Sequence, residues 1–236
     1  TLVGALGIGV ISLAGLAIVI HHATASVDGW LISPVSIVLF VVFMGAMYMI
    51  FRADQAQEQT KSKEEEEEKG EDHQYASARL SGAVLTYAAA AAIVVGTAVW
   101  LAHTGDQLAE EMGWEASFVG TQFLALSTSL PELAASFAAI RLNAPELAIS
   151  NLLGSNLFNM GFVLFLDDVA YTDGALWATV SEVHVFTAIA AILMTTVVII
   201  SLVNRQQDRP DRFWTVEAVL LIGLYIAASL LVFYIG

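Results

Sequence analysis

Long apolar runs separated by short polar segments dominate this chain. Seven of the runs are long enough, or nearly so, to cross the hydrocarbon core of a membrane, which takes about 20 helical residues. They cover residues 2–21, 31–51, 80–103, 116–140, 146–166, 184–203 and 213–235. The pattern predicts an all-α integral membrane protein with seven transmembrane helices.

The composition supports an integral membrane protein and argues against several other kinds of partner and site. Hydrophobic residues make up 57% of the chain, charged residues make up 14%, and the mean hydropathy is +0.71. The net charge of −14 argues against nucleic acid as a partner, because phosphate binding needs a basic face. The lack of cysteine excludes disulfides, thiolate metal sites and thiol catalysis.

The segment 53–79 is the most polar part of the chain, and we interpret it as a solvated acidic loop. If the spans alternate in direction and this loop is cytoplasmic, all nine Lys and Arg residues lie on the cytoplasmic side. They are Arg52, Lys61, Lys63, Lys69, Arg79, Arg141, Arg205, Arg209 and Arg212. We therefore expect an integral protein of a prokaryotic plasma membrane with loop 53–79 in the cytoplasm. The acidic residues of the opposite loops, 104–115 and 167–183, are expected to be solvated.

Two polar stretches interrupt the apolar runs. In the first, Pro131 lacks an N–H and crowds the carbonyl of Ser127, so we expect a break that frees carbonyl oxygens at membrane depth. Thr128 and Ser129 lie four and three residues before Glu132. This spacing places both hydroxyls on the face of the carboxylate.

The second stretch follows after a short connection, 141–146, which predicts that the two helices are antiparallel neighbours. Asn151, Ser155 and Asn159 recur every four residues and share one helical face. Gly154 is expected to let another backbone come close. The two polar faces are therefore expected to converge.

Hydroxyl, carbonyl, amide and carboxylate oxygens are typical ligands of hard cations such as sodium and calcium. Two other interpretations stay open at this point. The Ser and Thr hydroxyls would bond to their own helix while the Asn side chains join helices. A nucleophilic serine would make the chain an enzyme, but no histidine lies at membrane depth beside Ser129 or Ser155 to act as a base. We therefore expect no enzymatic activity.

The stretch from Ser127 to Leu133, followed by Gly154-Ser155-Asn156-Leu157-Phe158-Asn159, resembles the second alpha repeat of the cation/calcium exchanger superfamily. That resemblance implies a fold of ten helices in two inverted halves, with ions bound at the midplane between the halves. Residues 1–52 would hold the last two spans of the N-terminal half. Residues 53–79 would be the central loop, and residues 80–236 the C-terminal half with the repeat at 116–166. The missing N-terminal half would lie upstream or in a separate chain.

The resemblance also implies a function and a ligand set. Thr128, Ser129 and Glu132 match the ion ligands of the first motif, and Ser155 and Asn159 match those of the second. The implied function is a secondary antiporter that exchanges calcium for sodium by alternating access, with these ions as cargo and no cofactor. A proton-coupled exchanger is the alternative within transport. A membrane assembly or sensor subunit that binds calcium or a partner through the acidic loop is the alternative outside it.

Three positions depart from the family pattern. Ser127 stands where the family usually has Gly or Ala, and Ser150 where it usually has Gly. Asn159 occupies a position that is Asp in many sodium/calcium exchangers. This half therefore brings one formal negative charge, on Glu132, instead of two.

Overall fold

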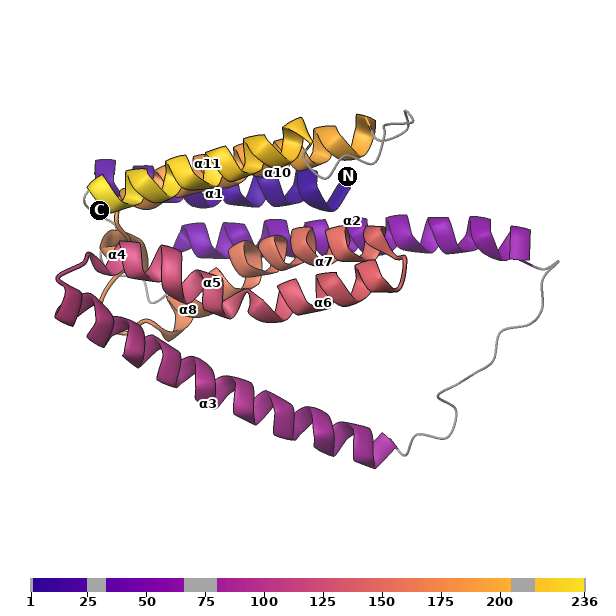
Figure 1. Ribbon diagram of the computed structural model, residues 1–236, viewed down its shortest axis with the longest axis horizontal. Coiled ribbons are helices and arrows are strands. Elements are labelled where there is room, and N and C mark those ends of the chain that lie inside the picture. Colours follow the sequence, from indigo (N-terminus) through magenta and orange to yellow (C-terminus); the bar gives the residue numbers. More distant parts are fainter. Residues whose placement is uncertain (1, 25–32, 66–79, 205–214, 236) are drawn as a thin grey trace. The chain divides into compact units, whose positions relative to one another are not determined.

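The computed structural model describes residues 2–24, 33–65, 80–204 and 215–235, and this part of the chain contains helices and no strand (Figure 1). Within it, six helices are long and apolar enough to cross a membrane, or seven if the interrupted pair on either side of Ser129 counts as one span. The predicted all-α membrane class is confirmed. The elements are α1 (Leu2–Thr24), α2 (Pro34–Glu65), α3 (Leu80–Met112), α4 (Ala116–Val119), the π-helix η1 (Gly120–Leu124), α5 (Ala125–Thr128), α6 (Leu130–Arg141), α7 (Pro145–Phe158), the π-helix η2 (Asn159–Val163), α8 (Leu164–Ala170), α9 (Leu176–Thr179), α10 (Val183–Asn204) and α11 (Val216–Ile235).

Two helices extend well beyond the apolar runs that predicted them. α2 continues to Glu65 and α3 to Met112. The interpretation of residues 53–65 as loop was therefore wrong. Gln, Glu, Lys and Ala dominate that stretch, and these residues have high helix propensity in water, so the helix does not end with its apolar part. Residues 66–79, the rest of the predicted loop, lie outside the described residues.

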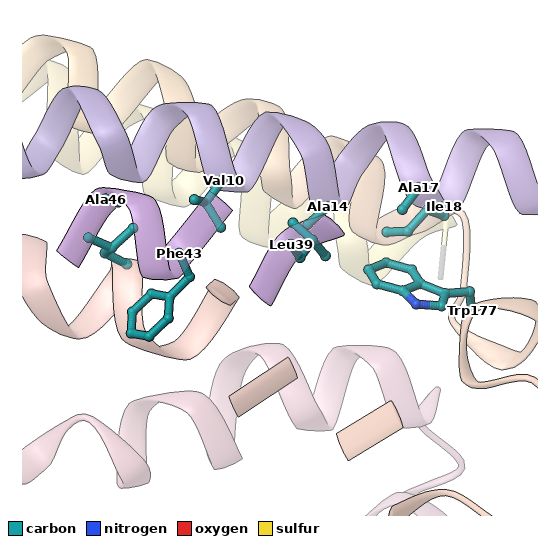
Figure 2. Close-up of a cluster of buried hydrophobic side chains, with 9 residues drawn as sticks. Val10, Ala14, Ala17, Ile18, Leu39, Phe43, Ala46 and Trp177 are labelled. Carbon is teal, nitrogen blue, oxygen red and sulfur yellow. The ribbon is translucent and has the colours of Figure 1, made fainter. Parts of the chain in front are cut away.

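The chain forms two compact units, of which the first comprises Thr1–Ile50 and Ser129–Gly236. In this unit α1 packs against α7 and α10, α11 packs against α10, and α6 packs against α7 (Figure 1). A continuous apolar cluster joins α1, α2, α7 and α9 (Figure 2). Its buried members are Val10, Ala14, Ala17, Ile18, Leu39, Phe43, Ala46, Leu157 and Trp177.

Two buried polar contacts fix the start of α2 in the same unit. The indole Nε1 of Trp177 donates to Ser36 Oγ at 2.8 Å, and the backbone N–H of Ser33 donates to Asp168 Oδ2 at 2.8 Å. Asp168 is only 4% exposed, so the expectation that the acidic residues of 167–183 are all solvated was wrong for this residue. A carboxylate at a helix N-terminus accepts an otherwise unpaired N–H and interacts favourably with the helix dipole.

The second unit comprises Phe51–Thr128. In it α3 packs against α4 and η1. An added Cβ at Gly105 would lie 2.7 Å from Leu124 Cδ2, so the glycine permits the close approach of α3 and η1. Trp114 stacks on Phe123 with ring centroids 5.7 Å apart and meets Phe118 edge-on at 5.6 Å. These rings hold the turn between α3 and α4.

Candidate ion site

A tight hairpin joins the two helices of the predicted site. After α6 ends, Asn143 adopts a left-handed conformation with φ 55°, which asparagine tolerates better than most residues. The N–H of Ala144 donates to Ala139 O at 2.9 Å, and the N–H of Asn143 donates to Ile140 O at 3.0 Å. This pair of bonds is a Schellman motif, and Pro145 then starts α7 with the backbone angle that a helix needs. The predicted antiparallel packing of the two helices is confirmed (Figure 1).

The helix is interrupted at Ser129, as the proline predicts. α5 ends at Thr128, the last residue of the second unit, and α6 begins at Leu130 in the first. Ser129 has φ −88° and ψ −1°, and Pro131 occupies the first turn of α6. Glu132 therefore lies in the first turn of a helix, where the unpaired N–H groups favour a negative charge.

The carboxylate of Glu132 has one partnered and one unpartnered oxygen. Ser155 Oγ donates to Glu132 Oε1 at 3.2 Å, which joins the two predicted polar stretches directly. Glu132 Oε2 is buried and has no hydrogen-bond partner among the described residues. Buried carboxylate oxygens without a partner are rare because their desolvation is costly, so such an atom indicates a missing positive charge or donor.

Asn151 adds a second link between the helices. Its amide Nδ2 donates to the backbone carbonyl of Glu132 at 3.2 Å and lies 3.4 Å from Ser136 Oγ. Residue spacing had placed Asn151 on the face of Ser155 and Asn159 but did not indicate which atoms it would contact. The family resemblance gave it no role.

The hydroxyls of the first stretch behave differently. Thr128 Oγ1 bonds to Leu124 O at 3.0 Å and Ala125 O at 3.1 Å, and Ser127 Oγ bonds to Phe123 O at 2.7 Å. This is the back-bonding of the structural interpretation. A hydroxyl that donates its hydrogen to a carbonyl still keeps lone pairs that a cation can use, so the bond does not exclude Thr128 as a ligand.

Ser129 presents its groups at the break itself. Its carbonyl accepts the N–H of Leu133 at 3.0 Å, and its side chain does not cap α6. The hydroxyl is thus not used by the helix terminus that it precedes.

Asn159 stands at a change of helix type that the sequence did not predict. It is the first residue of η2, in which the N–H of Leu164 donates to Asn159 O, five residues back. Short π-helical turns are often found at functional sites, because they shift the phase of the side chains that follow. A second such turn, η1, precedes α5.

The structure thus brings Glu132 and Ser155 together. Thr128, Ser129 and Asn159 stay predicted ligands. At Gly154 an added Cβ would meet none of the described atoms within 4 Å, so the close backbone approach expected there is not seen in this part of the chain. The described residues also contain no group of three His, Cys, Asp or Glu side chains placed to hold a metal ion.

Known proteins match the part of the chain that contains the candidate site. The sodium/calcium exchanger protein family matches residues 82–234. The chain is 28% identical over 145 residues to sodium/calcium exchanger MaX1 of Methanosarcina acetivorans, covering 61% of this chain and 39% of the relative. It is 29% identical over 131 residues to sodium/potassium/calcium exchanger 2 of Rattus norvegicus, covering 55% of this chain and 19% of the relative.

A shorter match, 42% identical over 48 residues, is to inner membrane protein YrbG of Escherichia coli and covers 20% of this chain and 15% of the relative. The chain therefore matches well under half the length of these relatives. No solved structure matches. The matched family covers more than half of the chain, including both polar stretches and the hairpin between them, and the chain belongs to the sodium/calcium exchanger protein family.

Proposed function

We propose that this chain is part of a secondary antiporter that exchanges calcium for sodium across a membrane. The observation that carries the proposal is the buried Oε2 of Glu132, which has no partner among the described residues, beside the Oε1 to which Ser155 donates. A carboxylate that accepts a serine hydroxyl on one oxygen and has no partner among the described residues on the other suits a hard cation. Sodium and calcium are cargo here, and no resident cofactor is part of the proposal.

The proposed ligands are Glu132, Ser155, Thr128, Ser129 and Asn159. A bare carboxylate at membrane depth costs about 2.5–3.5 kcal/mol or more, so an occluded state requires a cation on Glu132. Sodium and calcium compete for this group, and each occupancy favours a different arrangement of the helices. Because the occluded state forms only with calcium or sodium on the carboxylate, one ion is carried in each direction, and the two are exchanged.

The proposal includes a second half of the protein. Two of the matched relatives are much longer than this chain, and they are named as a sodium/calcium exchanger and a sodium/potassium/calcium exchanger. On this basis residues 80–236 form the C-terminal half, and an N-terminal half, upstream or in a separate chain, completes the ion site. The segment 53–79 would be cytoplasmic, and the host membrane a prokaryotic plasma membrane.

The test is calcium uptake into vesicles that contain the full-length protein. Glu132→Gln keeps the shape of the side chain and removes its charge, so it is expected to abolish sodium-dependent calcium uptake. Glu146→Gln, the same change at an exposed position in the first turn of α7, serves as the matched control and is expected to leave uptake unchanged. Sodium-dependent uptake retained in Glu132→Gln would refute the proposal.

Proton-coupled exchange is the second candidate, because Asn159 leaves Glu132 as the one acidic group among the five proposed ligands, and it is titratable. A pH gradient without sodium separates the two. Calcium uptake driven by protons alone would favour the second candidate, and uptake that needs sodium would favour the first. Each assay is run with and without potassium, since one relative is named for that ion.

A further inference from the structure

The amide of Asn151 is the donor that holds the main chain of Glu132. Its Nδ2 lies 3.2 Å from Glu132 O and 3.4 Å from Ser136 Oγ, so its two hydrogens have one acceptor each. Ser136 is 6% exposed and passes its own hydrogen to Ala148 O, at 3.5 Å. The hydrogen bonds therefore form a chain: Asn151 on α7 donates to Ser136 on α6, and Ser136 donates to Ala148 O on α7.

Asn151 and Ser155 lie one turn apart on α7 and act on opposite ends of the same residue. Ser155 holds the carboxylate of Glu132, and Asn151 holds its carbonyl. A single contact between two helices leaves one helix free to rotate or slide about it. Two contacts to one residue, plus the link to Ser136, fix both the rotation and the height of α6 against α7.

We propose that Asn151 is a positioning residue for ion binding, which sets the place of the Glu132 carboxylate without touching the ion. This rests on the function proposed above. α6 starts immediately after the break at Ser129, so its first turn lacks the support of a continuous helix. The bond from Asn151 replaces part of that support at the residue where the site needs it.

A purely structural role for Asn151 makes a different prediction. If the amide only joins the helices, its loss lowers stability and the amount of folded protein, but the molecules that fold bind calcium with ordinary affinity. If it positions Glu132, its loss weakens binding in the folded molecules. The apparent KM for calcium, separated from the maximal rate, distinguishes the two.

The experiment uses Asn151→Leu in the full-length protein. Leucine is close to asparagine in size, adds no charge near Glu132 and cannot donate. The apparent KM for calcium is expected to rise about three- to tenfold, as the loss of one or two hydrogen bonds implies, while the maximal rate per folded molecule changes less than twofold. Ser150→Ala is the control, because Ser150 is exposed and bonds only to Leu147 O among the described contacts.

A stability measurement in detergent tests the contact between Asn151 and Ser136 without relying on transport. Ser136→Ala, Asn151→Leu and the double variant form a cycle, and their effects on thermal unfolding are expected to be non-additive. An unchanged KM in Asn151→Leu, or additive stability effects, would overturn the inference. If the wild-type protein shows no sodium–calcium exchange, the proposed function fails, and additivity in the cycle still decides whether Asn151 holds α6 in place.

Discussion

Ser155 and Thr128 carry the same functional group, but the structure uses them differently. Ser155 donates to the carboxylate of Glu132, whereas Thr128 donates to carbonyls of its own helix. Removing the Ser155 hydroxyl leaves both oxygens of the carboxylate without a donor in the part of the chain that the structure describes. Removing the Thr128 hydroxyl leaves only exposed helix carbonyls that already have backbone partners.

We therefore predict that Ser155→Ala raises the apparent KM for calcium more than Thr128→Val does. The expected effect for Ser155→Ala is about ten- to hundredfold, since a hydrogen bond to a charged group is worth about 1.5–3 kcal/mol. The measurement is the calcium dependence of initial uptake rates in vesicles. An equal or larger effect of Thr128→Val would mean that the Thr128 hydroxyl binds the ion more directly than its hydrogen bonds suggest.

Asn159 gives a second prediction at this scale. Asn159→Asp adds a carboxylate of the same shape at the start of η2, and it is expected to raise the affinity for calcium more than that for sodium. The added Coulomb attraction is larger for a divalent ion, so a gain of at least about tenfold in calcium affinity is expected. The affinity for each ion is measured from the rise of the thermal unfolding midpoint as calcium, or in a separate series sodium, is added. A gain that is the same for both ions would show that this position does not face the bound cation.

Residue types and spacings predicted the contact between the two polar stretches, since Glu132 and Ser155 do meet. They did not predict the role of Asn151, because a spacing of four residues gives the face of a helix but not the partner that the face meets. They also did not separate a hydroxyl that back-bonds, as in Thr128, from one that crosses to another helix. That choice depends on the distance to the neighbouring helix, which no local pattern contains.

At the scale of elements, the apolar runs located every membrane-length helix, and proline located the break before α6. The π-helical turns were not predictable, because an extra residue in one turn leaves the apolar pattern nearly unchanged. The extension of α2 was missed for a different reason. Its polar residues ended the membrane signal, but they are good helix formers in water.

Packing of α2 on η2 depends on one small residue. An added Cβ at Gly161 would lie 2.5 Å from Phe43 Cβ, and Phe43 is 5% exposed in the central apolar cluster. Gly161→Ala is therefore predicted to destabilise the protein by about 1–3 kcal/mol through overpacking. Gly45→Ala on α2 is the control, because its added Cβ would meet no described atom within 4 Å.

Thermal unfolding in detergent measures both glycine variants. The expected result is a lower midpoint for Gly161→Ala and an unchanged one for Gly45→Ala. Equal midpoints would show that α2 and η2 separate easily enough to admit the methyl group.

At the scale of the whole molecule, the distribution of charge predicts the orientation of the helices in the membrane, which packing alone does not. The chain has a net charge of −14 and only nine Lys and Arg residues, which all fall on one side if the spans alternate. By length and composition, the six membrane-length helices and the interrupted pair around Ser129, counted as one span, match the seven crossings that this arrangement requires.

This orientation can be measured with single cysteines, because the chain has none of its own. In a cysteine-free full-length protein, Ser62→Cys near the end of α2 is predicted to react with a membrane-impermeant maleimide only from the cytoplasmic side. Thr172→Cys, at an exposed position after α8, is predicted to react only from the opposite side. The two positions are separated by three crossings, so they must label from opposite faces if the interrupted pair on either side of Ser129 crosses the membrane as one span. Labelling of both from one face would show that this pair enters and leaves on the same side, which would place Glu132 in a re-entrant loop and remove the midplane site on which exchange depends.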